Sequence, residues 1–124
     1  MNYQVAVRAL CEFTAKQGDL DLRFTPAPTA QEGIAGHQTV VSRRGAGYLS
    51  ELTLAGSYPG LLVIGRADGY DPELNLLEEI KTHRGDISRI PDNHRVLHWA
   101  QAKVYGWLLC AELQLEEIDL AVVY

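Results

Sequence analysis

Three short segments rich in strand-forming residues follow one another in the middle of this 124-residue chain, and they constrain its fold most. Residues 48–55 (YLSELTLA) alternate apolar and polar side chains, residues 61–68 (LLVIGRAD) are mostly apolar, and residues 74–82 (LNLLEEIKT) come third. Turn residues at 56–60 (GSYPG) and 69–72 (GYDP) separate them. This spacing predicts consecutive strands joined by hairpins, which is a β-meander.

A predicted helix precedes the meander and runs to about Arg44. Thr29 and Glu32 have the spacing of a capping box at its start, and Gly45 follows its end. His37 lies within this helix beside two glycines, so its imidazole can face a closely packed neighbour rather than water.

A long helix and a final strand follow the meander. We expect the helix to begin with Asp92 or Asn93 as its N-cap and to end near Leu115. Residues 118–124 (IDLAVVY) predict the strand. The helix carries an apolar stripe that should face the core, made of Leu97, Ala100, Val104, Leu108 and Ala111.

The chain is predicted to be a single domain, with residues 1–28 as an N-terminal extension and residues 29–124 as the core. In the extension, residues 3–7 predict a short strand, residues 8–16 a helix and residues 24–29 an extended segment. The order of helices and strands predicts an α/β fold built around a small mixed sheet.

Composition excludes several classes of protein. A net charge of −5 argues against tight, metal-independent binding of nucleic acid by bulk charge. Two cysteines are too few for a disulfide framework, so we expect a reducing, cytoplasmic location. No apolar run is long enough to span a membrane, and the N-terminus lacks a signal-peptide pattern.

Asp68, Glu79 and Lys81 are the main candidates for chemistry. Glu79 and Lys81 are two residues apart on a predicted strand, so they share one face, and the neighbouring strand can bring Asp68 beside them. Two carboxylates and a lysine could hold a divalent cation and a phosphate. The plainer interpretation remains open, because a Glu-x-Lys triplet on a strand is usually a solvated face.

These residues belong to a longer ordered set that resembles the PD-(D/E)xK nuclease superfamily. The set comprises His37, the GRADG segment with Asp68, the Glu79-Ile80-Lys81 triplet, and Gln101-x-x-x-Tyr105. Within the superfamily the chain is similar to RecB-like exonucleases and their CRISPR-associated relatives. The resemblance implies a restriction-endonuclease-like α-β-β-β-α-β core.

The resemblance also implies roles for these residues. A Mg²⁺ or Mn²⁺ ion would be held by His37, Asp68, Glu79 and the carbonyl of Ile80, with Lys81 catalytic beside Asp68 and Glu79. Gln101 and Tyr105 would position DNA or the lysine. Some relatives carry an iron–sulfur cluster held by four cysteines, which we do not expect in a chain with Cys11 and Cys110 alone.

A locally basic stretch follows the Glu-x-Lys triplet and could form a phosphate-binding rim, with Arg84 as the preferred DNA contact. An ordinary charged loop is the alternative.

The expected function is therefore metal-dependent hydrolysis of DNA in repair or processing. The chain also resembles nuclease domains fused to DinG- or Rad3-like helicases, so it could be the N-terminal part of a longer helicase. Two alternatives stay open: a catalytically weak DNA-binding or scaffolding module of a helicase, and a hydrolase acting on a small phosphoester.

Overall fold

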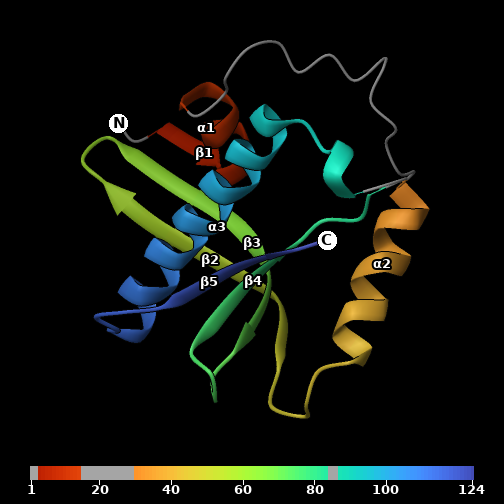
Figure 1. Cartoon of the computed structure of the whole chain (residues 1–124). Helices are drawn as coiled ribbons and strands as arrows, with labels where there is room; N and C mark the ends of the chain where they lie inside the picture. The colour runs from red at the N-terminus through yellow and green to blue at the C-terminus, as the bar shows by residue number, and fades with distance from the viewer. Residues whose placement is uncertain (1–2, 15–29, 84–86) are drawn as a thin grey trace.

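The computed structural model describes residues 3–14, 30–83 and 87–124. Within these ranges it contains one mixed five-stranded sheet, three α-helices and a short 3-10 helix (Figure 1). This confirms the predicted α/β fold around a small mixed sheet. The elements in chain order are β1 (Tyr3–Ala6), α1 (Val7–Thr14), α2 (Ala30–Ser42), β2 (Leu49–Tyr58), β3 (Leu61–Asp71), β4 (Leu76–Ile80), η1 (Ile87–Arg89), α3 (Asp92–Leu113) and β5 (Asp119–Val123).

β3 is the centre of the sheet. β2 pairs with it antiparallel along one edge, while the other edge is shared between β1, which is parallel to it, and β4, which is antiparallel. β5 then pairs in parallel with β4. The consecutive pairing of β2, β3 and β4 is the predicted meander, and it puts the end of β3 next to β4.

The hairpin between β2 and β3 is tighter than predicted. β2 continues through Gly56 to Tyr58, and the turn consists of Pro59 and Gly60. Gly60 has a φ of +80°, which glycine adopts without a steric penalty. β3 also continues past its predicted end to Asp71, so that Asp68 lies inside the strand and not at its end.

The core lies between the sheet and α3, with α1 packed beside α3 (Figure 1). The predicted apolar stripe of α3 is wrong in part, because Ala111 is exposed. The buried face of α3 includes Gln101, Ala102, Tyr105, Leu108 and Leu109. Tyr105 can reach the sheet because Gly65 leaves room for its ring, where a Cβ would lie 2.8 Å from the ring carbon Cε1.

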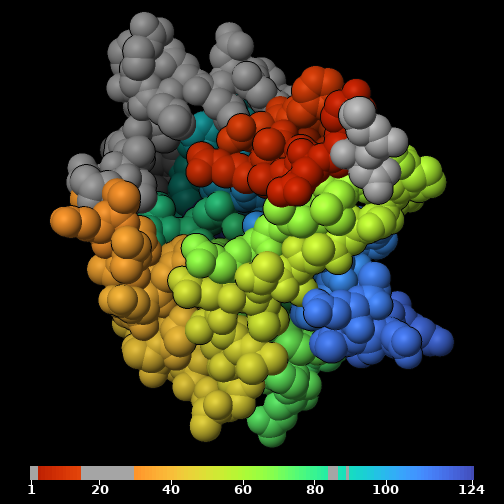
Figure 2. Space-filling view, turned by 180° about the vertical axis from the view of Figure 1, so that it is seen from behind, coloured from red at the N-terminus to blue at the C-terminus, as the bar shows by residue number. Residues whose placement is uncertain are grey.

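α2 stands apart from this core. It contains no buried residue, and Figure 1 shows it on the far side of the sheet from α3. Polar contacts that attach this segment include an ion pair from Arg44 to Glu78, a contact from His37 to Asp68 and a 3.5 Å hydrogen bond from the Thr82 hydroxyl to the carbonyl of Gly33. Seen from behind, α2 and α1 border a recess in the molecular surface (Figure 2).

The remaining sequence predictions have mixed outcomes. The cap residue Thr29 and the extended segment 24–29 lie outside the described residues. α3 begins with Pro91 as its N-cap and without a side-chain cap, so the Asp92 or Asn93 cap was wrong. The third strand is shorter than predicted, which leaves Lys81 directly after it. No helix in the described ranges is long and apolar enough to cross a membrane.

Candidate active site

Asp68 and Glu79 meet where β3 and β4 run side by side. Gly69 pairs with Glu78, and the same register continued by one residue sets Asp68 opposite Glu79. The carboxylate of Asp68 does not project freely, because its Oδ2 accepts a hydrogen bond of 2.8 Å from the backbone N–H of Ile80. Asp68 therefore fixes the end of β4 as well as facing Glu79.

Glu79 is the most unusual titratable group of the sheet. Its side chain is only 5% exposed; Oε1 lies 3.1 Å from the Nζ of Lys81, whereas Oε2 is buried without a hydrogen-bond partner. Burial, and then the negative charge of Asp68, raise the pKa of Glu79 from 4.5 to about 7, although Lys81 offsets part of the rise. A metal cation beside Glu79 would counteract this rise in pKa, because it would bind the unpartnered Oε2 and offset the negative charges of Asp68 and Glu79.

Lys81 follows the last residue of β4. Its backbone N–H donates a 2.8 Å hydrogen bond to the carbonyl of Val123 in β5, and its side chain is 29% exposed. The ammonium group therefore bonds the buried carboxylate of Glu79 while remaining partly open to solvent. It can contact an anion that approaches from outside.

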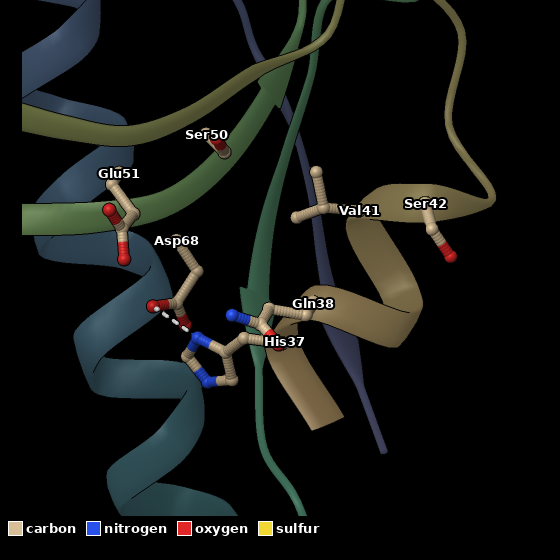
Figure 3. A pocket seen from close by; sticks show the side chains of 7 residues that line it. All are labelled: His37, Gln38, Val41, Ser42, Ser50, Glu51 and Asp68. Atoms are coloured by element: carbon tan, nitrogen blue, oxygen red, sulfur yellow. Dashed lines mark ion pairs between the residues drawn. The ribbon is translucent and has the colours of Figure 1, made fainter. Parts of the chain in front are cut away.

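His37 reaches the site from α2. Its Nδ1 lies 3.6 Å from Oδ1 of Asp68 (Figure 3), which is longer than a hydrogen bond. α2 comes close to the end of β4 at Gly36, where an added Cβ would overlap the side chain of Thr82. The close packing therefore occurs at Gly36, whereas the His37 side chain is 36% exposed, so the prediction that its imidazole faces a packed neighbour rather than water is wrong in part.

The predicted metal ligands are brought together only in part. Within the described residues, no three His, Cys, Asp or Glu side chains are gathered into a group that could hold a metal ion. What the fold assembles is a pair of facing carboxylates, Asp68 and Glu79, with an imidazole beside the first. The backbone N–H of Ile80 donates a hydrogen bond to Asp68. The role of the Ile80 carbonyl as a metal ligand stays a prediction.

Gln101 and Tyr105, the predicted helix motif, lie on the buried face of α3. They are only 4% and 8% exposed, and Oε1 of Gln101 has no hydrogen-bond partner. Burial, and then the charges of Glu79 and Asp68, raise the pKa of Tyr105 to about 12. The pKa of Cys11, which is buried in α1, is also raised, first by burial and then by the negative charge of Glu79. Tyr105 therefore lies close enough to the carboxylates to be affected by their charges, and Gln101 is buried on the same face of α3.

The predicted basic rim is described only in part, because Arg84 lies outside the described residues. Arg95, another cation of this stretch, uses its guanidinium to bond backbone oxygens. Its Nη2 donates to the carbonyl of Ile87 at 2.6 Å, and its Nε donates to that of Ile90 at 3.4 Å. Arg95 therefore holds the loop around η1 in place.

The sequence reasoning missed Glu51. This residue of β2 lines two hollows of about 380 and 320 Å³, both together with His37 and Asp68, and Figure 3 shows its carboxylate beside Asp68. Glu51 has a φ of +54°. Ser50 pairs with Gly69 and Leu52 with Ala67, so the register set by the two-residue turn at Pro59 and Gly60 places Glu51 level with Asp68. Placing the turn correctly would have revealed it.

Comparison with protein-family models gives no match, and comparison with curated proteins gives none either. Among solved structures, the chain is similar to the crystal structure of SSO0001, with a TM-score of 0.54 and 23% sequence identity. The similarity covers 88% of this chain and 58% of that one. At this level of identity, the chain shares with part of that protein its fold alone.

Proposed function

We propose that the chain is a divalent-metal-dependent deoxyribonuclease of the PD-(D/E)xK superfamily, with a restriction-endonuclease-like core formed by α2, β2, β3, β4, α3 and β5. One observation carries the proposal. Glu79 is a buried carboxylate with one oxygen bound to Lys81 and the other unpartnered, and it faces the carboxylate of Asp68. Asp68 within β3, Glu79 in β4 and Lys81 directly after β4 are the central members of the ordered set that resembles this superfamily.

The donor set suits a hard divalent cation. Carboxylate oxygens from Asp68 and Glu79 are the ligands that Mg²⁺ and Mn²⁺ prefer, and the imidazole of His37 favours Mn²⁺. The carbonyl of Ile80 is the fourth proposed ligand. When bound, the ion would polarise a phosphoryl oxygen and lower the pKa of a water molecule.

The chain's own residues supply the rest of the chemistry. Lys81 carries a partly exposed ammonium at the edge of the site, where it can stabilise the negative charge that develops on a phosphodiester. Gln101 and Tyr105 are buried, and Tyr105 lies near enough to Glu79 and Asp68 for their charges to raise its pKa, so we assign the two residues to positioning the site and not to direct contact with DNA. Arg84 remains the proposed DNA contact, and a linked helicase and a cytoplasmic location belong to the same proposal.

A cleavage assay tests the function. The chain is incubated with end-labelled single- and double-stranded DNA in the presence of Mg²⁺, Mn²⁺ or a chelator. We expect metal-dependent cleavage that Lys81→Ala abolishes and Lys103→Ala leaves unchanged, since Lys103 is an exposed residue of α3.

The other outcomes separate the alternatives. DNA binding without cleavage would replace the proposal with the scaffolding module, and turnover of nucleotides without cleavage of DNA would replace it with the hydrolase acting on a small phosphoester. Equal cleavage by Lys81→Ala and the parent chain would refute the assigned site.

A further inference from the structure

Lys81 lies at the end of a strand, where backbone hydrogen bonds break more readily than in the middle. It follows the last residue of β4, and its backbone is tied to the sheet by the hydrogen bond from its N–H to the carbonyl of Val123. The ends of strands exchange and fray more readily than their centres. The position of the Lys81 ammonium therefore depends on how firmly Val123 is held.

Tyr124, the next residue after Val123, is clamped by side chains. Its hydroxyl lies 2.7 Å from Nδ1 of His98 in α3, a hydrogen-bond distance. The guanidinium carbon of Arg95 lies 5.5 Å from the centre of its ring, and the ring of His83 meets it edge-on at 6.2 Å. Tyr124 thereby joins the end of β5 to α3 and to the segment that follows Lys81.

His98 is suited to bonding Tyr124 and unsuited to binding phosphate as a cation. Burial, and then the positive charges of Lys81, His94 and Arg95, lower the pKa of His98 from 6.5 to about 4. The imidazole is therefore neutral at physiological pH. A neutral ring beside Lys81 does not compete with the ammonium for Glu79 or for an anionic substrate.

We propose that His98 and Tyr124 are positioning residues for Lys81. Their hydrogen bond holds the end of β5, and the end of β5 holds the backbone from which the Lys81 side chain reaches Glu79. The inference rests on the proposed nuclease function. It adds to it a clamp outside the ordered set of His37, Asp68, Glu79, Lys81, Gln101 and Tyr105.

The test compares four single variants, and the double variant of Tyr124→Phe with His98→Ala, with the parent chain in Mn²⁺. Tyr124→Phe removes the hydroxyl but keeps the ring, His98→Ala removes the imidazole, and His98→Asn retains a polar atom near the place of Nδ1. Tyr58→Phe is the matched control, because the side chain of Tyr58 is exposed at the end of β2.

We expect Tyr124→Phe and His98→Ala each to lower kcat about tenfold, with KM for DNA and the Mn²⁺ dependence nearly unchanged. The double variant should be no worse than either single variant, and His98→Asn should recover part of the loss. Amide exchange at Lys81 should accelerate in the same variants, and Tyr58→Phe should change nothing.

The outcomes distinguish the two proposals. If the parent chain cleaves DNA while Tyr124→Phe and His98→Ala keep its kcat, the clamp is refuted and the nuclease function stands. A rise in KM with unchanged kcat would also refute positioning of Lys81, since it would indicate a role in substrate binding. Absence of cleavage by the parent chain would overturn the function and the clamp with it.

Discussion

Glu78 and Glu79 are neighbours on β4, both are buried, and the sheet uses them in opposite ways. Both oxygens of Glu78 accept hydrogen bonds from the guanidinium of Arg44, at 2.7 and 2.8 Å. Glu79 has Lys81 on one oxygen and no partner on the other. The two side chains point to opposite faces of the strand, one towards the α2 segment and one towards α3.

The contrast shows that burial of a carboxylate does not by itself mark a functional site. Glu78 is satisfied on both oxygens and serves to attach α2, which has no buried residue of its own. One oxygen of Glu79 has no hydrogen-bond partner, and burial and the charge of Asp68 raise the pKa of Glu79. Glu79 is therefore expected to matter for cleavage, and Glu78 for stability.

Replacing each glutamate with glutamine should separate the two roles. We expect Glu79→Gln to lower DNA cleavage by roughly 10²- to 10³-fold, because the carboxylate that faces Asp68 is lost. Glu78→Gln should retain most of the activity under conditions where it remains folded. Initial cleavage rates in Mn²⁺ measure both effects, and equal losses in the two variants would abolish the distinction.

Removal of Arg44 should damage stability. Arg44→Ala leaves Glu78 buried without its partner, and we expect a loss of about 3 kcal/mol in the free energy of unfolding. Arg43→Ala, at the exposed neighbouring residue, should change it by less than about 0.5 kcal/mol. Urea unfolding measures both variants. A similar small effect in the two would show that the ion pair does not anchor α2.

The pKa of Glu79 predicts a dependence of stability on pH in the presence of a chelator. Between pH 4.5 and about 7 the folded chain retains a proton on Glu79 that the unfolded chain has released. The contribution of Glu79 to stability is therefore greatest below pH 4.5, falls as the pH rises towards 7, and stays low above it.

Glu79→Gln removes this dependence. The variant should be more stable than the parent chain at pH 8 by about 2 kcal/mol, and the difference should shrink towards pH 5. Urea unfolding at the two pH values measures it. Addition of Mn²⁺ should stabilise the parent chain more than the variant. A parent chain that is as stable as the variant at pH 8 without metal would contradict the raised pKa.

Two glycines of α2 should respond to alanine with opposite signs. A Cβ at Gly33 would have no atom within 4 Å, so Gly33→Ala should stabilise the protein by about 0.5–1 kcal/mol through helix propensity. A Cβ at Gly36 would overlap Thr82, so Gly36→Ala should destabilise it by about 1 kcal/mol. Thermal unfolding measures both. A stabilising Gly36→Ala would mean that the contact with Thr82 is easily relieved.

The sequence predicted which helices and strands form, but it predicted the residues at which they begin and end less well. Alternation and turn residues located the three meander strands, because hydrophobic period and turn chemistry are local properties. The extent of β2 and β3 was missed, since Gly56 and Gly69 read as turn residues. The side chain of Leu108 fills the space that a Cβ at Gly56 would occupy, and that of Tyr48 fills the space at Gly69. Both glycines therefore allow close packing within a strand and do not mark a turn.

The candidate site was also predicted in part. Asp68, Glu79 and Lys81 were identified from their spacing, and the register of β3 and β4 brings them together. Glu51 was missed because its place opposite Asp68 depends on where the hairpin turns. The clamp between His98 and Tyr124 joins residues 26 positions apart, and no local pattern reveals it.

The type and order of the helices and strands, and the small ordered set of titratable side chains, could be predicted from the sequence. These depend on local hydrophobic period, turns and spacing. The tertiary structure alone decided which of two adjacent glutamates is satisfied by Arg44 and which is left with a free oxygen. That difference depends on which distant groups share a buried, poorly solvated space, and local sequence does not encode this directly.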